Sequence, residues 1–220
     1  AIRAYAENAR IFLARERPAS ADTNLEQIIE LTARMSEISA QLRQFSRKSG
    51  ETLTAVSPEA CFDYALRLFQ ARLREAGVEV IRRWPEEPCW VRADLVRLEQ
   101  VLVNLIGNAL QAMAATAGPR LELSIAVQAE RVVMSVADNG PGIPDEHLGQ
   151  IFEPFFTTKP TGKGLGLGLS ISSRIIDDLG GSLSAANCPE GGARFTIRLP
   201  RHDTPATAGT TAQQETLPHA

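Results

Sequence analysis

Apolar side chains recur at helical spacing in the first 45 residues, which predicts a helix over residues 1–17, a turn at 19–24 and a second helix at 25–45. The second helix carries two heptad series offset by three: Ile28, Met35 and Leu42; Leu31, Ile38 and Phe45. Two helices alone bury two such stripes poorly. The pattern therefore favours a helical hairpin that pairs with a second copy in a four-helix bundle, over a helix lying on a core.

The pattern changes after a polar stretch, which we interpret as a linker over residues 49–57. Helices are predicted at 58–76, 94–116 and 167–179, and strands at 78–84, 89–91, 120–127, 131–137, 181–187 and 193–200. This order predicts an α+β fold, a two-layer α/β sandwich with a mixed sheet over residues 58–200. Residues 139–164 form a long Gly- and Pro-rich loop, which is typical of a functional or disordered segment. The last residues, 201–220, have little to bury and are expected to be disordered.

Composition narrows the class of protein. The net charge of −3 leaves no basic surplus for nucleic-acid binding, and no apolar run is long enough to span a membrane. Three scattered cysteines are too few for a disulfide framework, so a reduced, cytoplasmic compartment is expected. The chain lacks a signal peptide and an initiator Met, which suggests a piece of a longer protein. If the longer protein is anchored in the inner membrane, the anchoring segments are expected upstream of residue 1.

The predicted helix over 94–116 carries a polar arc opposite its apolar face. Asn104, Asn108 and Gln111 share this arc, which Arg97 and Gln100 extend. Asparagine costs up to ~0.7 kcal/mol relative to alanine inside a helix, so two of them four residues apart indicate a use for their carboxamides. Neutral oxygens suit a Mg²⁺ ion held mainly by substrate phosphates and water. A solvated helix face is the alternative interpretation.

An apolar strand then delivers a carboxylate to its end, in the run Asp138-Asn139-Gly140-Pro141-Gly142. An ionised carboxylate can accept a hydrogen bond from the exocyclic amine of adenine, whereas guanine has a carbonyl at that position. The glycines would let the backbone approach the base closely. An ordinary Asp-Gly turn is the alternative.

Two further segments follow in the same loop. In residues 162–169 every second residue is a glycine, and a predicted helix follows. Such a run leaves backbone N–H groups free to bind phosphate, and Lys159 and Lys163 add positive charge. This run has neither the ending of a Walker loop nor the preceding strand of a Rossmann fingerprint. Residues 151–159 hold three of the eight phenylalanines, which fits a small core that pins the loop, a lid over a ligand, or both.

Taken in this order, residues 98–109, 138–143, 151–159 and 162–169 resemble the ATP-binding domain of sensor histidine kinases, which belongs to the superfamily of gyrase, MutL and the heat-shock chaperone ATPases. Residues 191–195 resemble the last glycine box of that family. Upstream, residues 1–9 resemble the stretch just after the phosphoacceptor in dicarboxylate and nitrogen sensors. The resemblance implies a Bergerat-type ATP-binding fold, preceded by part of the dimerisation and phosphotransfer hairpin over residues 1–48.

The same resemblance implies ATP and Mg²⁺ as ligands. Asn108 would be the main Mg²⁺ ligand with Asn104 beside it, Asp138 would bind the adenine amine, and Gly142 would line the base pocket. The other implied ATP-binding residues are Gly140, Ile143, Phe156, Thr158, Lys159, Lys163, Gly164, Leu165, Gly166, Leu167 and Gly168.

The implied activity is that of a protein histidine kinase in a two-component system. It would act as a homodimer and transfer the ATP γ-phosphoryl group to a histidine, then to an aspartate of a response-regulator receiver domain. His147, His202 and His219 all lie outside the first helix, so the phosphoacceptor is expected before residue 1 and this chain is expected not to phosphorylate itself. A nucleotide-binding regulatory module without phosphotransfer is the alternative. A topoisomerase- or chaperone-type ATPase is disfavoured by the hairpin and by the absence of a glutamate base at the position of Asn104.

Overall fold

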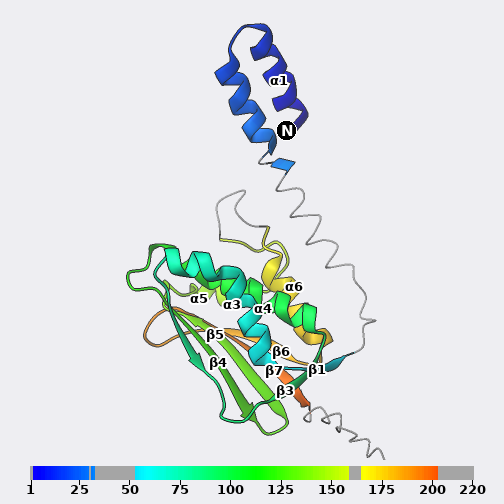
Figure 1. Cartoon of the computed structure of the whole chain (residues 1–220), viewed down its shortest axis with the longest axis vertical. Helices are drawn as coiled ribbons and strands as arrows, with labels where there is room; N and C mark the ends of the chain where they lie inside the picture. Colours follow the sequence, from blue (N-terminus) through cyan, green and yellow to red (C-terminus); the bar gives the residue numbers. More distant parts are fainter. Residues whose placement is uncertain (1, 30, 33–52, 159–164, 203–220) are drawn as a thin grey trace, which may run out of the picture. The chain divides into compact units, whose positions relative to one another are not determined.

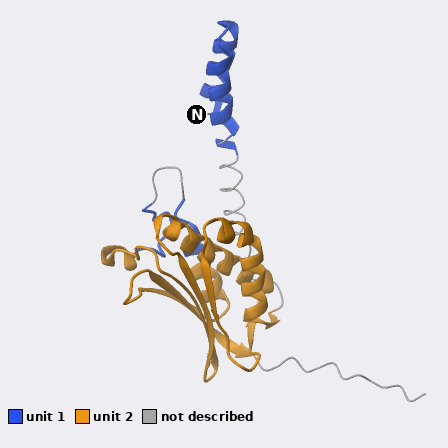
Figure 2. Ribbon diagram, turned by 60° about the vertical axis from the view of Figure 1, so that its left-hand side comes forward, with its two compact units in different colours: residues 1–50, 150–171 blue, residues 51–149, 172–220 orange. Residues whose placement is uncertain are grey.

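The computed structural model describes residues 2–29, 31–32, 53–158 and 165–202. The chain divides into two compact units, residues 1–50 with 150–171 and residues 51–149 with 172–220 (Figure 2). The fold is α+β with a mixed sheet, which confirms the predicted fold class. Within the described residues, no helix combines the length and the apolar character that crossing a bilayer requires.

Two helices make up the start of the first unit, α1 (Ile2–Ala14) and a second helix over residues 18–29, which lie side by side (Figure 1). Ala9 and Ala21 are buried, whereas Leu13 and Ile29 are 57% and 68% exposed. The turn predicted at 19–24 is wrong. Pro18 begins the second helix, because proline fits the first turn of a helix, where its missing N–H has no partner to lose.

The dimeric bundle stays a prediction. Most of its heptad seam, from Met35 to Phe45, lies outside the described residues. A second copy would cover exposed apolar side chains such as Leu13 and Ile29.

A seven-stranded sheet forms the frame of the second unit, in the order β1-β3-β7-β5-β4-β2 with β6 alongside β7 (Figure 1). All neighbouring strands are antiparallel except β2 and β4, which are parallel. The strands are β1 (Thr54–Val56), β2 (Glu79–Arg83), β3 (Trp90–Ala93), β4 (Arg120–Gln128), β5 (Arg131–Asp138), β6 (Ser182–Asn187) and β7 (Ala193–His202).

Two of the helices begin where the sequence supplies a side-chain cap. The Ser57 hydroxyl accepts a hydrogen bond from the Ala60 N–H, and the Asp94 carboxylate accepts one from the Arg97 N–H at 3.0 Å. The helices are α3 (Pro58–Glu75), α4 (Leu95–Ala112), the 3₁₀ turn η1 (Met113–Ala115), α5 (Asp145–Leu148) and α6 (Gly168–Asp178).

The core lies between the sheet and the helices, which cover one face of it (Figure 2). Along β5 the buried Val132, Met134 and Val136 occupy alternate positions, and they pair in register with Leu199, Ile197 and Phe195 of β7. Phe62 of α3 and Leu98, Leu102 and Leu105 of α4 are fully buried above them. Burial raises the pKa of the Cys61 thiol to about 12, so this cysteine is a small apolar core residue.

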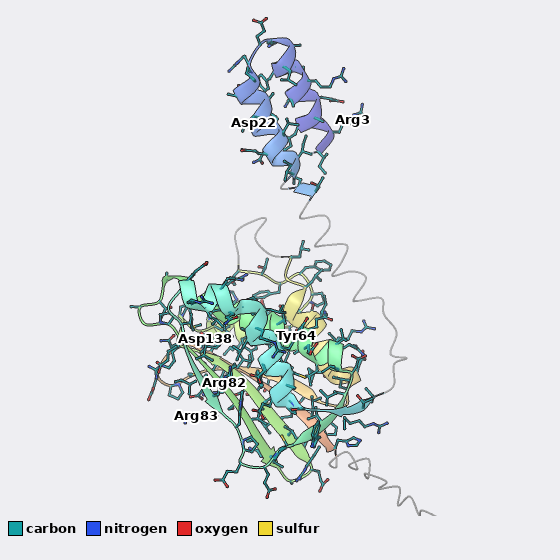
Figure 3. The ribbon with its side chains drawn as sticks, viewed as in Figure 1. Arg3, Asp22, Tyr64, Arg82, Arg83 and Asp138 are labelled. Carbon is teal, nitrogen blue, oxygen red and sulfur yellow. The ribbon has the colours of Figure 1, made fainter. Side chains whose placement is uncertain are left out.

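The opposite face of the sheet is polar. Glu122 of β4 accepts hydrogen bonds from both Arg83 and Arg194, each at 3.1 Å. Arg82, the neighbour of Arg83 on β2, instead pairs with Asp63 of α3 at 3.2 Å (Figure 3). Consecutive arginines therefore serve opposite faces of the sheet, as the period of a strand requires.

Three boundary predictions need correction. The predicted linker over 49–57 contains β1, which pairs with β3; a strand of three residues is too short for its sequence pattern to reveal it. The predicted loop over 139–164 contains α5. Strand β7 continues past Pro200 to His202, which pairs with Trp90, so residues 201 and 202 do not belong to the predicted disordered tail. Residues 203–220 lie outside the described residues.

Gly181→Ala should lower the free energy of unfolding by roughly 1–3 kcal/mol, the usual cost of overpacking. A Cβ atom there would collide with the Arg198 carbonyl oxygen and lie 2.7 Å from a methyl carbon of Leu199. Gly149→Ala is the matched control, because its Cβ would meet nothing within 4 Å and its φ of −74° suits any residue. Denaturant unfolding of both variants measures the difference, and equal stabilities would contradict this packing.

Candidate nucleotide site

Asp138 is the last residue of β5 and belongs to the series that faces the helices. Val132, Met134 and Val136 precede it at steps of two, so the carboxylate lies on the helix-covered side of the sheet, at its end (Figure 3). The residue is only 6% exposed. The strand therefore carries a charged group into a position that otherwise belongs to the core.

Two backbone N–H groups hold the Asp138 carboxylate. Its Oδ1 accepts a hydrogen bond from the Gly140 N–H at 2.9 Å and another from the Ala193 N–H at 3.4 Å. Within the described residues, Oδ2 accepts no hydrogen bond. Burial raises the pKa of Asp138 above its ordinary value, and the two backbone hydrogen bonds oppose that rise. The site thus presents one anchored and one unengaged carboxylate oxygen.

The hairpin between β6 and β7 closes over Asp138. Gly192 has a φ of +86°, and a Cβ atom at this position would collide with the Asp138 carbonyl oxygen. Only glycine allows both the conformation and the close approach. The sequence pointed to this glycine box only through resemblance, and the role of the Ala193 N–H was not foreseen.

The loop after Asp138 is packed just as closely. A Cβ at Gly140 would lie 3.3 Å from the backbone of Ala112, at the C-terminal end of α4. Gly142 has a φ of +79°, and its Cβ would lie 2.9 Å from Oδ1 of Asn187. The N–H and C=O of Ile143 both bond to the Asn187 side chain. Gly140, Gly142 and Ile143, all predicted site residues, therefore lie in one short segment beside Asp138.

Asn139 has a structural role that the sequence analysis missed. Its amide oxygen accepts a hydrogen bond from the Arg120 N–H at 2.7 Å, and its NH₂ group donates to the Gly118 carbonyl at 2.9 Å. Its own N–H donates to the Arg120 carbonyl. Asn139 thereby ties the end of β5 to the turn that leads into β4.

The polar arc of α4 divides into two functions. Arg97 forms an ion pair with Asp178 of α6 at 2.6 Å, and the NH₂ group of Asn104 donates to the Ser172 hydroxyl at 2.9 Å. Asn108 is half-buried, and its side chain makes no hydrogen bond within the described residues. It lies one helical turn before Ala112 and so on the face that meets Gly140. Arg97 and Asn104 therefore hold α6, whereas Asn108 has no described hydrogen-bond partner and lies near the glycine loop, which comprises residues 140–143.

The other predicted site residues belong to the first unit or lie outside the described residues. Gly166 has a φ of +68°, its Cβ would collide with the Phe156 carbonyl oxygen, and its own carbonyl accepts a hydrogen bond from the Phe155 N–H at 3.0 Å. Gly166 of the glycine run (residues 162–169) is thus packed against the phenylalanine box, the predicted segment of three phenylalanines that begins at Ile151. Thr158 is exposed and Leu167 is buried; Leu165 and Gly168 are half-buried, and Gly168 begins α6. Lys159, Lys163 and Gly164 lie outside the described residues.

The phenylalanine box is not a closed core. Ile151 is 7% exposed, but Phe155 is 70% exposed and has a φ of +68°. The small core predicted to pin the loop therefore fits the buried Ile151 but not the exposed Phe155. The lid over a ligand stays a prediction.

Comparison with known proteins agrees with this geometry. Residues 93–203 match the family described as histidine kinase-, DNA gyrase B- and HSP90-like ATPases. The chain belongs to this family. The match begins at the end of β3 and includes α4, Asp138 and the closing hairpin.

Sensor kinases are among the proteins that this chain is similar to. The C4-dicarboxylate transport sensor protein DctB of Pseudomonas aeruginosa is 43% identical over 219 residues, which cover 98% of this chain and 35% of that protein. The nucleotide-free catalytic domain of histidine kinase ThkA superposes with a TM-score of 0.62 at 32% identity, covering 69% of this chain and 97% of that one. The complex of ThkA with the response regulator TrrA gives a TM-score of 0.70 at 26% identity, covering 91% of this chain and 59% of that one.

The chain therefore carries the ATPase domain of a sensor histidine kinase. It spans about a third of the length of the curated relatives it matches.

In this histidine kinase ATPase domain, Asp138→Asn should abolish most of the affinity for adenine nucleotides and leave the fold intact. The amide oxygen could still accept from Gly140 and Ala193, but its NH₂ group would face the adenine amine, a donor against a donor. Such a loss costs roughly 1–3 kcal/mol or more. Titration calorimetry on both forms measures it, and equal affinities would contradict the assignment.

Acidification should change the affinity for ATP and the free energy of unfolding in opposite directions, which provides a second test of Asp138. Because the pKa of Asp138 is raised, the affinity of the wild type for ATP should fall on acidification at a higher pH than an ordinary aspartate would cause. The unfolding free energy should move the other way, since a buried charge costs stability that protonation restores. The contribution of Asp138 to stability should therefore decrease as the pH rises from the ordinary to the raised pKa, and the Asn variant should lack this change.

Proposed function

We propose that this chain binds Mg-ATP, with the adenine amine on Asp138 and Mg²⁺ on Asn108 of α4. Phosphate binding by the glycine run of residues 162–169 stays a prediction from the sequence. The observation that carries the proposal is the buried carboxylate of Asp138, one oxygen of which is anchored by two N–H groups while the other has no described partner. A buried acceptor without a donor is costly, so a ligand that supplies an N–H group is strongly favoured.

The same carboxylate accounts for a choice of base. The carbonyl of guanine would bring a second acceptor against Asp138, with no proton between them, in a place that excludes water. Rejection of a wrong partner by an unpaired buried group can reach 10⁴- to 10⁵-fold in sites of this kind. Adenine nucleotides are therefore the proposed ligands.

Asn108 fits the role of the Mg²⁺ ligand. The residue is half-buried on the face of α4 that meets the glycine loop, and its carboxamide makes no hydrogen bond to a described residue. Mg²⁺ takes few protein ligands and keeps phosphate oxygens and water, so a single neutral oxygen suffices. When bound, the ion would neutralise phosphate charge. Asn104 would contribute its amide oxygen beside Asn108, since its NH₂ group is held by Ser172.

The proposed reaction is transfer of the γ-phosphoryl group to a histidine and then to an aspartate of a response-regulator receiver domain. Its support is the similarity to sensor kinases and to the ThkA–TrrA complex. Such transfer depends on positioning and charge stabilisation more than on covalent chemistry. Dimerisation through residues 1–48, a cytoplasmic kinase region and a phosphoacceptor outside the three histidines of this chain belong to the same proposal. His147 lies in α5 and His202 ends β7.

Asn108→Ala should reduce Mg²⁺-dependent nucleotide binding while thermal stability holds or rises slightly, because alanine is the better helix former. Val96→Ala is the matched control on the same helix, since Val96 is 63% exposed and three turns away. Calorimetric titration with and without Mg²⁺, together with melting curves, measures both effects. A variant that melts at a lower temperature yet binds Mg-ATP normally would make Asn108 a structural residue.

The phosphotransfer proposal can be tested in a chimera. This chain replaces its matched region in the Pseudomonas aeruginosa relative, and the chimera is incubated with γ-labelled ATP. We expect acid-labile label on the chimera, strongly reduced by Asp138→Asn within it, and no acid-labile label on the 220-residue chain alone.

Each departure from this result has a definite meaning. A chimera that binds ATP but acquires no label would favour the regulatory module without phosphotransfer. Acid-labile label on the chain alone would place the acceptor at His147, His202 or His219. Calorimetry on the same samples shows that any unlabelled protein still binds nucleotide.

A further inference from the structure

Asn187, the last residue of β6, pairs its side-chain amide with the backbone of a distant residue. Its Oδ1 accepts a hydrogen bond from the Ile143 N–H at 2.8 Å, and its Nδ2 donates to the Ile143 carbonyl at 2.7 Å. The two residues are 44 positions apart in the chain. The side chain thus reproduces the pair of hydrogen bonds that a neighbouring strand would make.

The glycine loop has few other attachments. Between Gly140 and Ile143, its described backbone makes hydrogen bonds only to two side chains, that of Asp138 at Gly140 and that of Asn187 at Ile143. Asp138 thereby fixes the start of the loop, and Asn187 fixes its far end.

Gly142 lies between these two attachments, and its lack of a side chain leaves room for the amide of Asn187. A Cβ there would lie 2.9 Å from Oδ1 of Asn187 and 3.4 Å from the Gly192 carbonyl oxygen. The amide of Asn187 therefore occupies the space that any other residue at 142 would fill.

The residue type is decisive at position 187. Only asparagine and glutamine carry a donor and an acceptor on one planar carboxamide group, the arrangement that matches a backbone N–H and C=O, and glutamine is a methylene longer. Aspartate would keep the acceptor but would turn a second oxygen toward the Ile143 carbonyl, and toward Asp145, whose carboxylate lies 3.5 Å from Nδ2.

The hairpin that carries Asn187 also holds Asp138. Asn187 pairs in register with Ala193, whose N–H donates to Oδ1 of Asp138. Movement of this strand end would displace the carboxylate and the glycine loop together.

We propose that Asn187 is a positioning residue of the nucleotide site: its amide holds the loop of Gly140–Ile143 at the distance from Asp138 that an adenine ring requires. The inference rests on the proposed function for the ligand, but not for the hydrogen bonds themselves. Asn187 touches no phosphate group in this scheme. Its loss should therefore weaken ADP and a non-hydrolysable ATP analogue by the same factor.

The experiment compares the wild-type chain with Asn187→Ala and Asn187→Asp. Ser184→Ala is the matched control on the same strand, because the Ser184 hydroxyl bonds only to Thr196 and Arg198 of β7 among the described residues. Hydrogen exchange is measured without nucleotide over residues 140–145. Calorimetry gives the affinity for ADP and for the ATP analogue, and melting curves give the stability.

Both Asn187 variants should exchange faster over residues 140–145 and bind both nucleotides about fivefold more weakly, the weak end of what two partly exposed hydrogen bonds contribute. Their melting temperatures and the exchange of the core strands should match those of Ser184→Ala. Unchanged loop exchange or unchanged affinity overturns the proposal, as does a loss explained by general destabilisation. If the wild type binds no nucleotide, the proposed function fails, while the exchange data still decide whether Asn187 holds the loop.

Discussion

A buried carboxylate constrains the second unit of this protein more than any other group. Asp138 sits at a core-facing position of a central strand, where an unpaired charge would be expensive. Two backbone N–H groups donate hydrogen bonds to this carboxylate, that of Gly140 on the loop and that of Ala193 on the hairpin. These donors occupy one oxygen and leave the other toward the site. The cost of burial is thus only partly offset, which is the condition for a ligand to complete the arrangement.

The close approach of backbone segments explains why glycines gather here. Gly192 lies against the Asp138 carbonyl, Gly140 against the end of α4 and Gly142 against Asn187. A side chain at any of these positions would separate segments whose spacing sets the geometry of the carboxylate. In the first unit, Gly166 packs against the phenylalanine box in the same manner. Several glycines that could serve a ligand therefore have a packing role of their own.

Helix α4 supplies the second frame of the site. Its start is capped by Asp94, and Arg97 and Asn104 bind side chains of α6. These contacts fix the rotation of the helix about its axis, and that rotation brings Asn108 toward the loop at Gly140. Arg97 and Asn104 of the polar arc thus hold α6, and the Asn108 carboxamide makes no hydrogen bond to any described residue.

The sequence predicted most of the order of helices and strands, the periodicity of the core and the family resemblance, because each depends on spacing within a short stretch. It also placed Asp138 at the end of a strand and Asn108 on the polar arc of a helix, as the structure shows. Pro18, β1 and α5 were assigned wrongly or missed, since short elements are decided by tertiary pairing more than by local preference. The hydrogen-bond partners of Asn104, Asn139 and Asn187 were also found only in the structure. Their partners lie 68, 19 to 21 and 44 residues away, and an asparagine reads the same in a sequence whether it binds a ligand, a hydroxyl group or a backbone. A hydrogen bond needs its two atoms within about 3 Å, and for residues so far apart in the chain only the folded sheet and hairpin bring that about.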